Sequence, residues 1–125
     1  MRLWHKDLIS VLPRQQLLGQ HRECCALRGK GWGKNHATVN YVFTHPFSWL
    51  FGYHLRVMSE MMVRGYRVGM EWYNPYYRGK QIGCDHLMQI DPYWQAYPEH
   101  NDAYLHECRE NLRGKGITLS GGDEL

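Results

Sequence analysis

The sequence predicts an all-α fold, a compact single domain over residues 1–125 with about three main helices and long aromatic-rich loops. Two observations predict the helices. Apolar side chains recur at three- and four-residue spacings in three segments, and a glycine closes each segment. The chain is also long enough to bury a core without disulfides or a metal, so no second domain is needed.

The first helix is predicted from Pro13 to about Arg28, because proline suits a first helical turn and Gly29 ends the periodic pattern. A mid-helix glycine, Gly19, costs about 1 kcal/mol relative to alanine, so it indicates close approach of backbone or ligand beside Glu23. The inward stripe comprises Leu17, Leu18, His21, Cys24, Cys25 and Arg28. The residues on the other side are Gln15, Gln16, Gly19, Gln20, Arg22 and Glu23.

The second helix is predicted over about residues 46–64, with Gly65 as its C-terminal stop and a methionine-rich stripe that packs in the core. The third begins near Asn101 or Asp102 and ends at Gly114. Between them, residues 66–98 are rich in proline, glycine and aromatic side chains, which indicates loops. These loops either wrap the core or offer stacking surfaces to bases.

The distribution of charge indicates a polyanionic partner. The formal net charge is +3, from 15 Lys and Arg against 12 Asp and Glu. Between Arg14 and Lys34 the only acid is Glu23, whereas acids gather in the later part of the chain. The basic end therefore suits a nucleic acid, although a solvated charged surface is the plainer alternative. No apolar run would span a membrane and no signal peptide is evident, so we expect a cytoplasmic protein.

A glycine-rich basic loop over residues 28–36 follows the first helix. It lacks the spacing and the Lys-Ser/Thr ending of a P-loop, but three glycines with two lysines and a tryptophan can wrap a phosphate backbone. We expect double-stranded DNA as the partner of a monomeric protein. The residues predicted to contact DNA are Arg2, Arg14, Arg28, Lys30, Trp32, Lys34 and His36.

Four stretches of the first half resemble the pyrimidine-dimer DNA glycosylase/AP-lyase family. They are Met1-Arg2-Leu3-Trp4, the run Leu17-Leu18-Gly19-Gln20-His21-Arg22-Glu23, His36-Ala37-Thr38-Val39 and Val63-Arg64-Gly65-Tyr66. The resemblance implies base excision from DNA by the α-amine of the chain, which would be that of Met1, since the large Arg2 disfavours removal of the initiator. It also implies that Glu23 carries the proton transfers. Arg22 would grip a phosphate.

An α-amine is chemically suited to act as the nucleophile. An α-amine has an unperturbed pKa of about 7.7 to 8.0, so a substantial fraction is neutral near pH 7, whereas a lysine near 10.4 is almost fully protonated. Nearby cations such as Arg2 and Arg22 would lower the pKa of the amine further. The cation that the family carries about one turn after the glutamate is missing from residues 24–26, which leaves Arg28 and Lys30 as substitutes.

Two other interpretations stay open. The cysteines and several histidines could form a metal site, but no C-x2-C pair exists and the spacing matches no usual zinc module, so we expect reduced core cysteines, no metal and no cofactor. The residues in that interpretation are Cys24, Cys25, Cys84, Cys108, His21, His36, His86 and His106. The other interpretation is a noncatalytic nucleic-acid-binding protein of the same fold, in which Glu23 only orients Arg22.

Overall fold

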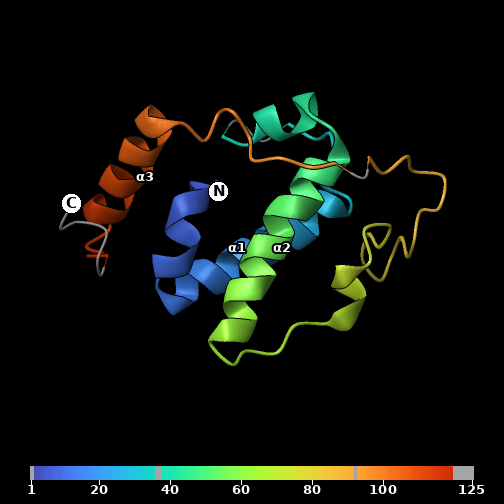
Figure 1. Ribbon diagram of the computed structural model, residues 1–125, viewed down its shortest axis with the longest axis horizontal. Helices are drawn as coiled ribbons and strands as arrows, with labels where there is room; N and C mark the ends of the chain where they lie inside the picture. Colours follow the sequence, from blue (N-terminus) through green and yellow to red (C-terminus); the bar gives the residue numbers. More distant parts are fainter. Residues whose placement is uncertain (1, 36–37, 92, 120–125) are drawn as a thin grey trace.

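The computed structural model describes residues 2–35, 38–91 and 93–119, and over these ranges the protein is all-α, as predicted (Figure 1). Its elements are η1 (Lys6–Val11), α1 (Arg14–Arg28), η2 (Asn40–Thr44), α2 (Phe47–Val63), η3 (Met70–Tyr73) and α3 (Asp102–Gly114), where η denotes a 3₁₀ helix. Within the described ranges the only β-type pairing is one isolated bridge between Tyr77 and Cys84.

The three predicted helices end where local chemistry stops them. Pro13 and Pro46 immediately precede α1 and α2, and the Gly29 amide closes α1 by donating to the carbonyls of its last turn. Gly65 follows α2 with a φ of 84°, a left-handed conformation that favours glycine. At α3 the Asn101 side chain accepts from the Tyr104 amide, so the sequence located all three α-helices closely.

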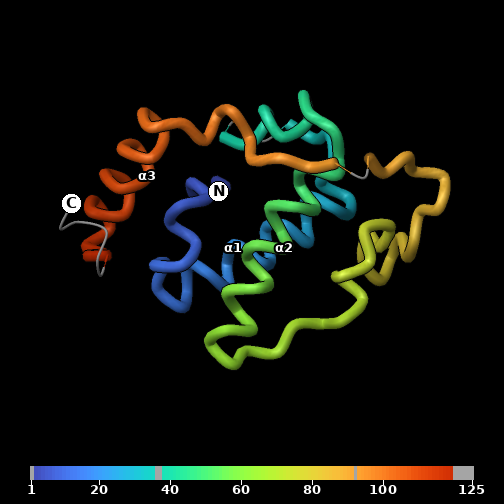
Figure 2. Tube along the Cα trace, in the orientation of Figure 1, coloured from blue at the N-terminus to red at the C-terminus, as the bar shows by residue number. Residues whose placement is uncertain are grey.

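The core forms where α1 packs against α2, and residues 2–12, the N-terminal segment, cover one side of it. Figure 2 shows this segment lying between α3 and the α1–α2 pair, which cross one another. The segment contributes large buried side chains, including Leu3, Trp4 and Leu8, to the same cluster as Leu17 of α1 and Leu50 of α2. The start of the chain is therefore built into the core.

The described residues between 66 and 98 leave the end of α2 and run along the outside of the molecule before α3 (Figure 1). Apart from η3, they form turns and irregular backbone, as predicted from their proline and glycine content. Tyr93 and Trp94 are exposed within this segment, whereas Tyr97 is buried in the core. None of the helices in the described part of the chain is long and apolar enough to cross a membrane.

Candidate active site

A cavity of about 310 Å³ opens between the N-terminal segment, α1 and the end of α3. Four of its lining residues, Gln16, Gly19, Gln20 and Glu23, recur at positions i, i+3, i+4 and i+7 of α1 and so form one stripe of that helix. The other lining residues are Arg2, Trp4, Thr38, Asn111 and Lys115. Glu23, the predicted catalytic carboxylate, and Arg2, which follows the predicted nucleophile in the chain, thus line the same cavity.

Gly19 lines this cavity together with Glu23. A Cβ built on Gly19 would meet only the Arg22 Nη2 atom, at 3.7 Å, which is an ordinary van der Waals contact. No neighbouring atom among the described residues therefore requires glycine here, and the helix would be more stable with alanine. The described residues therefore show no close approach of backbone at Gly19, and the approach of a ligand beside Glu23 stays a prediction.

Two cations border the cavity. Arg2 pairs with Glu107 of α3 at 3.5 Å and lies over the Trp4 ring, and Lys115 covers the same ring with its Nζ 5.4 Å from the centroid. Sequence reasoning missed Lys115 and Asn111, because nothing local links the end of α3 to a glutamate in α1. Arg22 is exposed on α1 next to Glu23 and does not line the cavity.

The residues predicted to contact DNA differ in how exposed their side chains are. Arg14, Lys30 and Lys34 are exposed, in agreement with a role at the surface. Trp32 is half-buried, with its ring set edge-on to Phe43 and Phe47 at centroid distances of 5.0 and 4.9 Å, so it anchors the glycine-rich loop to the fold. Met1 and His36 lie outside the described residues.

Arg28 does not fit the predicted DNA contact, because its side chain is fully buried. Nη1 donates to the Trp72 carbonyl and to His54 Nδ1, and Nη2 donates to the carbonyls of Asn74 and Tyr77. All four terminal N–H groups are therefore used inside the protein. Burial lowers the pKa of Arg28 to about 10, so the side chain remains a cation at neutral pH and holds the segment 72–77 against α1.

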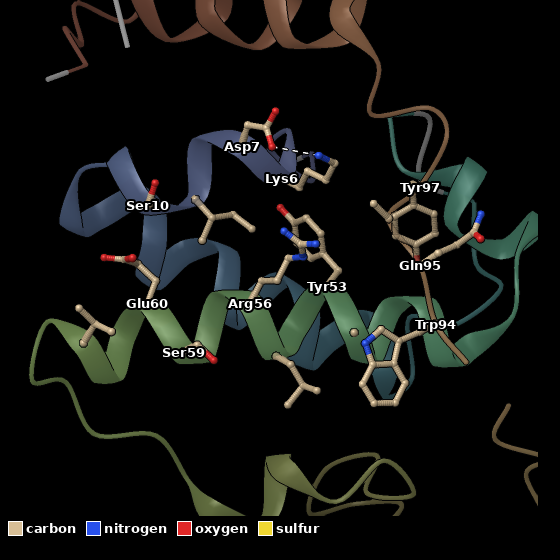
Figure 3. A pocket seen from close by; sticks show the side chains of 15 residues that line it. Lys6, Asp7, Ser10, Tyr53, Arg56, Ser59, Glu60, Trp94, Gln95 and Tyr97 are labelled. Atoms are coloured by element: carbon tan, nitrogen blue, oxygen red, sulfur yellow. Dashed lines mark hydrogen bonds and ion pairs between the residues drawn. The ribbon is translucent and has the colours of Figure 1, made fainter. Parts of the chain in front are cut away.

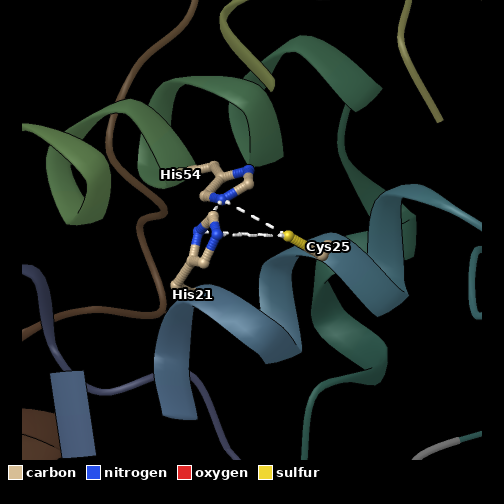
Figure 4. A group of neighbouring side chains, drawn as sticks. All are labelled: His21, Cys25 and His54. Carbon is tan, nitrogen blue, oxygen red and sulfur yellow. Dashed lines mark hydrogen bonds between the residues drawn. The ribbon is translucent and has the colours of Figure 1, made fainter. Parts of the chain in front are cut away.

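Arg28 adjoins a cluster of His21, Cys25 and His54, whose possible ligand atoms all lie within 4.8 Å of one another (Figure 4). His21 Nδ1 is 2.8 Å from His54 Nε2, and Cys25 Sγ is 3.7 Å from His21 Nε2. These residue types are zinc ligands, and three of them would leave an open coordination position. The cluster is therefore the metal site that the described residues would offer.

The hydrogen-bond pattern opposes a metal at this cluster. The Arg28 cation must donate to His54 Nδ1, so the proton of the neutral His54 ring sits on Nε2 and is donated to His21 Nδ1. A ligating histidine instead donates its second N–H to an acceptor. Burial also raises the pKa of Cys25 to about 12, which disfavours the thiolate that a metal would need. The residues fit a hydrogen-bonded cluster better than a metal.

A larger cavity of about 680 Å³ lies on another face, among η1, α2 and residues 94–97 (Figure 3). Trp94 sits over α2 there, and it can do so only because residue 52 is glycine, since a Cβ would come within 2.2 Å of its ring. The wall includes both signs of charge, such as Arg56 and Glu60. None of the predicted site residues that the structure describes lines this cavity, so size alone does not identify the active site.

The N-terminal part of the chain is similar to a known protein family. The sequence model of the family described as pyrimidine dimer DNA glycosylase matches residues 1–74, more than half of the chain. No curated protein and no solved structure matches. The matched range contains Glu23 and the N-terminal segment but not α3, which supplies Asn111 and is followed directly by Lys115. The chain belongs to the pyrimidine dimer DNA glycosylase family, whose members are DNA repair enzymes that act on DNA.

Proposed function

We propose that this protein is a DNA N-glycosylase with AP-lyase activity, that is, cleavage at apurinic or apyrimidinic sites. It acts as a monomer on double-stranded DNA and removes damaged bases, pyrimidine dimers among them. The observation that carries the proposal is the shared cavity of Glu23 and Arg2, because Arg2 is bonded directly to the first residue of the chain. Family membership supports a DNA glycosylase, and the cavity supports this particular chemistry.

In the proposed reaction the neutral α-amine of Met1 attacks C1′ of the target deoxyribose. The bond between C1′ and the base breaks, and the base leaves with the electron pair and takes up a proton. The attacking nitrogen loses a proton, and its electron pair then displaces the ring oxygen from C1′; this oxygen takes up a proton, and an imine joins the nitrogen to the opened sugar. Glu23 stabilises the developing positive charge and accepts the 2′ proton, after which β-elimination breaks the bond from C3′ to the phosphate oxygen.

Binding of DNA would rest on cations around this face. Arg2 and Lys115 border the cavity, and Arg22 is exposed beside Glu23 to hold a phosphate. Arg14, Lys30 and Lys34 extend the basic surface along α1 and the loop after it. Such contacts position a duplex without reading its sequence, so the lesion would be selected by its ease of extrusion from the helix.

The proposal is tested by strand cleavage on duplex oligonucleotides that carry one abasic site or one thymine dimer. Glu23→Gln keeps the shape of the side chain but removes its basicity, so cleavage should fall by about 100-fold or more while DNA affinity stays within a few-fold. Glu71→Gln, at an exposed glutamate away from the cavity, is the matched control and should cleave like the parent. Equal cleavage by the Glu23 variant and the parent would rule out this role for Glu23. If the parent protein cleaves neither duplex, the alternative of a noncatalytic DNA-binding protein is favoured.

A further inference from the structure

The backbone of Arg2, Leu3 and Trp4 is held by side chains from all three α-helices. The Gln20 amide of α1 donates from Nε2 to the Arg2 carbonyl at 3.0 Å and accepts from the Trp4 amide at 2.6 Å. The Tyr53 hydroxyl of α2 is 2.6 Å from the Trp4 carbonyl, and the Tyr104 hydroxyl of α3 donates to the Leu3 carbonyl at 2.5 Å. Each of these three consecutive backbone carbonyls thus accepts a hydrogen bond from a helix side chain.

Gln20 is central to this arrangement. Its side chain is only 3% exposed, and its Oε1 also lies 2.8 Å from the Tyr53 hydroxyl, which shares its one proton between two acceptors. The amide orientation is determined by its partners, because the Trp4 N–H requires an oxygen and the Arg2 carbonyl requires an N–H. Gln20 precedes Glu23 by three residues, so the two side chains lie on the same stripe of α1.

We propose that Gln20, Tyr53 and Tyr104 are positioning residues that hold the start of the chain at the Glu23 cavity, so that the α-amine reaches its target in a reactive geometry. This inference rests on the proposed function, because it assumes that the α-amine is the nucleophile. A chain terminus is free to move unless it is tied down, and a nucleophile displaced by about 1 Å can react 100-fold more slowly. Fixing the backbone at Arg2 limits where the adjoining amine can go.

The inference also gives α3 a role in the reaction although α3 lies outside the family match. Tyr104 of α3 holds Leu3, and Glu107 of the same helix pairs with Arg2. The segment after residue 74 is therefore needed to complete the N-terminal arrangement. No local sequence pattern indicates this role, because the Gln20 amide and the hydroxyls of Tyr53 and Tyr104 come together only in the folded chain.

The test compares Gln20→Met and Tyr104→Phe with a matched control, Tyr97→Phe. The Tyr97 hydroxyl is buried and has no hydrogen-bond partner among the described residues, so its loss removes a buried tyrosine hydroxyl without touching the N-terminal segment. Tyr104→Phe loses one hydroxyl from a half-buried ring, so it keeps the test valid if Gln20→Met fails to fold. Thermal unfolding and DNA affinity are measured for each variant.

The readout is the rate at which borohydride traps an imine with a duplex that carries one abasic site, under single-turnover conditions across a range of pH. Both positioning variants should form the imine about tenfold more slowly or worse, with DNA affinity within a few-fold. The pH at half-maximal rate should stay close to that of the parent, because placement of the amine changes and its acidity does not. Tyr97→Phe should match the parent.

Two outcomes separate the inference from the function on which it rests. If the parent forms an imine on Met1 and the positioning variants form it equally fast, the positioning role is overturned and the proposed function stands. If the parent forms no imine, the proposed mechanism fails and the inference fails with it. Loss of DNA binding in step with the imine rate would indicate a general structural defect and would also overturn the inference.

Discussion

Two faces of α1 carry the residue types that do chemistry, and they differ in how their polar atoms are used. The cluster face meets α2 and the segment 72–77 and consists of His21, Cys25 and Arg28. The cavity face meets the N-terminal segment and consists of Gln16, Gly19, Gln20 and Glu23. On the cluster face the terminal N–H groups of Arg28 and the facing histidine nitrogens are saturated within the protein, whereas the cavity face borders about 310 Å³ of space.

A gathering of histidine, cysteine and arginine is therefore not by itself a functional site. Buried polar groups need hydrogen-bond partners, and the protein supplies them to both Nη atoms of Arg28 without a ligand, although its buried Nε has no partner among the described residues. A site for a substrate needs the opposite arrangement, in which a few functional groups border space that the fold leaves empty. On this reasoning, changes on the cluster face should alter stability, and changes on the cavity face should alter activity.

The largest expected effect on stability is at Arg28. Arg28→Met keeps most of the side-chain volume but removes the donors to Trp72, Asn74, Tyr77 and His54, so the free energy of unfolding should fall by about 3 kcal/mol. Urea unfolding followed by circular dichroism measures the loss. An Arg28 variant as stable as the parent but defective in DNA binding would contradict the structural role of the cluster face and would support Arg28 as a phosphate contact.

The next effect is the pH dependence of stability. Burial is the largest cause that lowers the pKa of His21 and His54, and it lowers the pKa of His100 to about 3, so these side chains are neutral when folded and take up protons on unfolding below about pH 6.5. Their contribution is complete above about pH 6.5 and decreases as the pH falls. The free energy of unfolding should therefore drop by about 2 kcal/mol between pH 7 and pH 5 for each of these histidines that stays neutral in the folded protein. A flat profile over this interval would mean that the buried histidines are already charged in the folded protein.

Gly19→Ala should separate stability from activity on the cavity face. The added methyl group meets no obstacle, so the variant should be more stable by up to about 1 kcal/mol. Gly19 lines the cavity together with Glu23, so the added methyl group should take up space there and slow cleavage of an abasic duplex. A shift of the thermal midpoint upward with reduced cleavage is the expected pair of results. Unchanged cleavage would show that substrate does not enter the cavity near Gly19.

The smallest expected effect concerns metal at the cluster face. Because Arg28 occupies His54 Nδ1, we expect purified protein to hold far less than one equivalent of zinc and to keep its thermal midpoint in the presence of a chelator. Elemental analysis with a chelator series checks both points. One equivalent of zinc that is lost together with folding would make the cluster a metal site and would require Arg28 to leave His54.

Much of the fold could be predicted from the sequence, because proline, glycine and apolar spacing act locally. Gly29, Gly65 and Asn101 marked helix ends where the structure has them. The 3₁₀ helices were not predicted, since elements of four to six residues are too short to show a period.

The candidate site was predicted only in part. Glu23 was identified through its family pattern, but Gln20 was placed on the outer side of its helix and is buried, because the N-terminal segment covers that face. Arg28 had conflicting interpretations, as an inward residue and as a DNA contact, and its burial favours the first. Lys115 and Tyr104 depend on contacts across most of the chain, which no local pattern encodes.

The central claim is that the cavity face of α1 is the active site and that the α-amine of the chain is its nucleophile. The most direct measurement is peptide mapping by mass spectrometry after borohydride trapping on an abasic duplex. We expect a DNA adduct on Met1, absent after acetylation of the terminus and strongly reduced in Glu23→Gln. An adduct on Lys115, which borders the same cavity, or on any other lysine would contradict the claim that the terminus is the nucleophile.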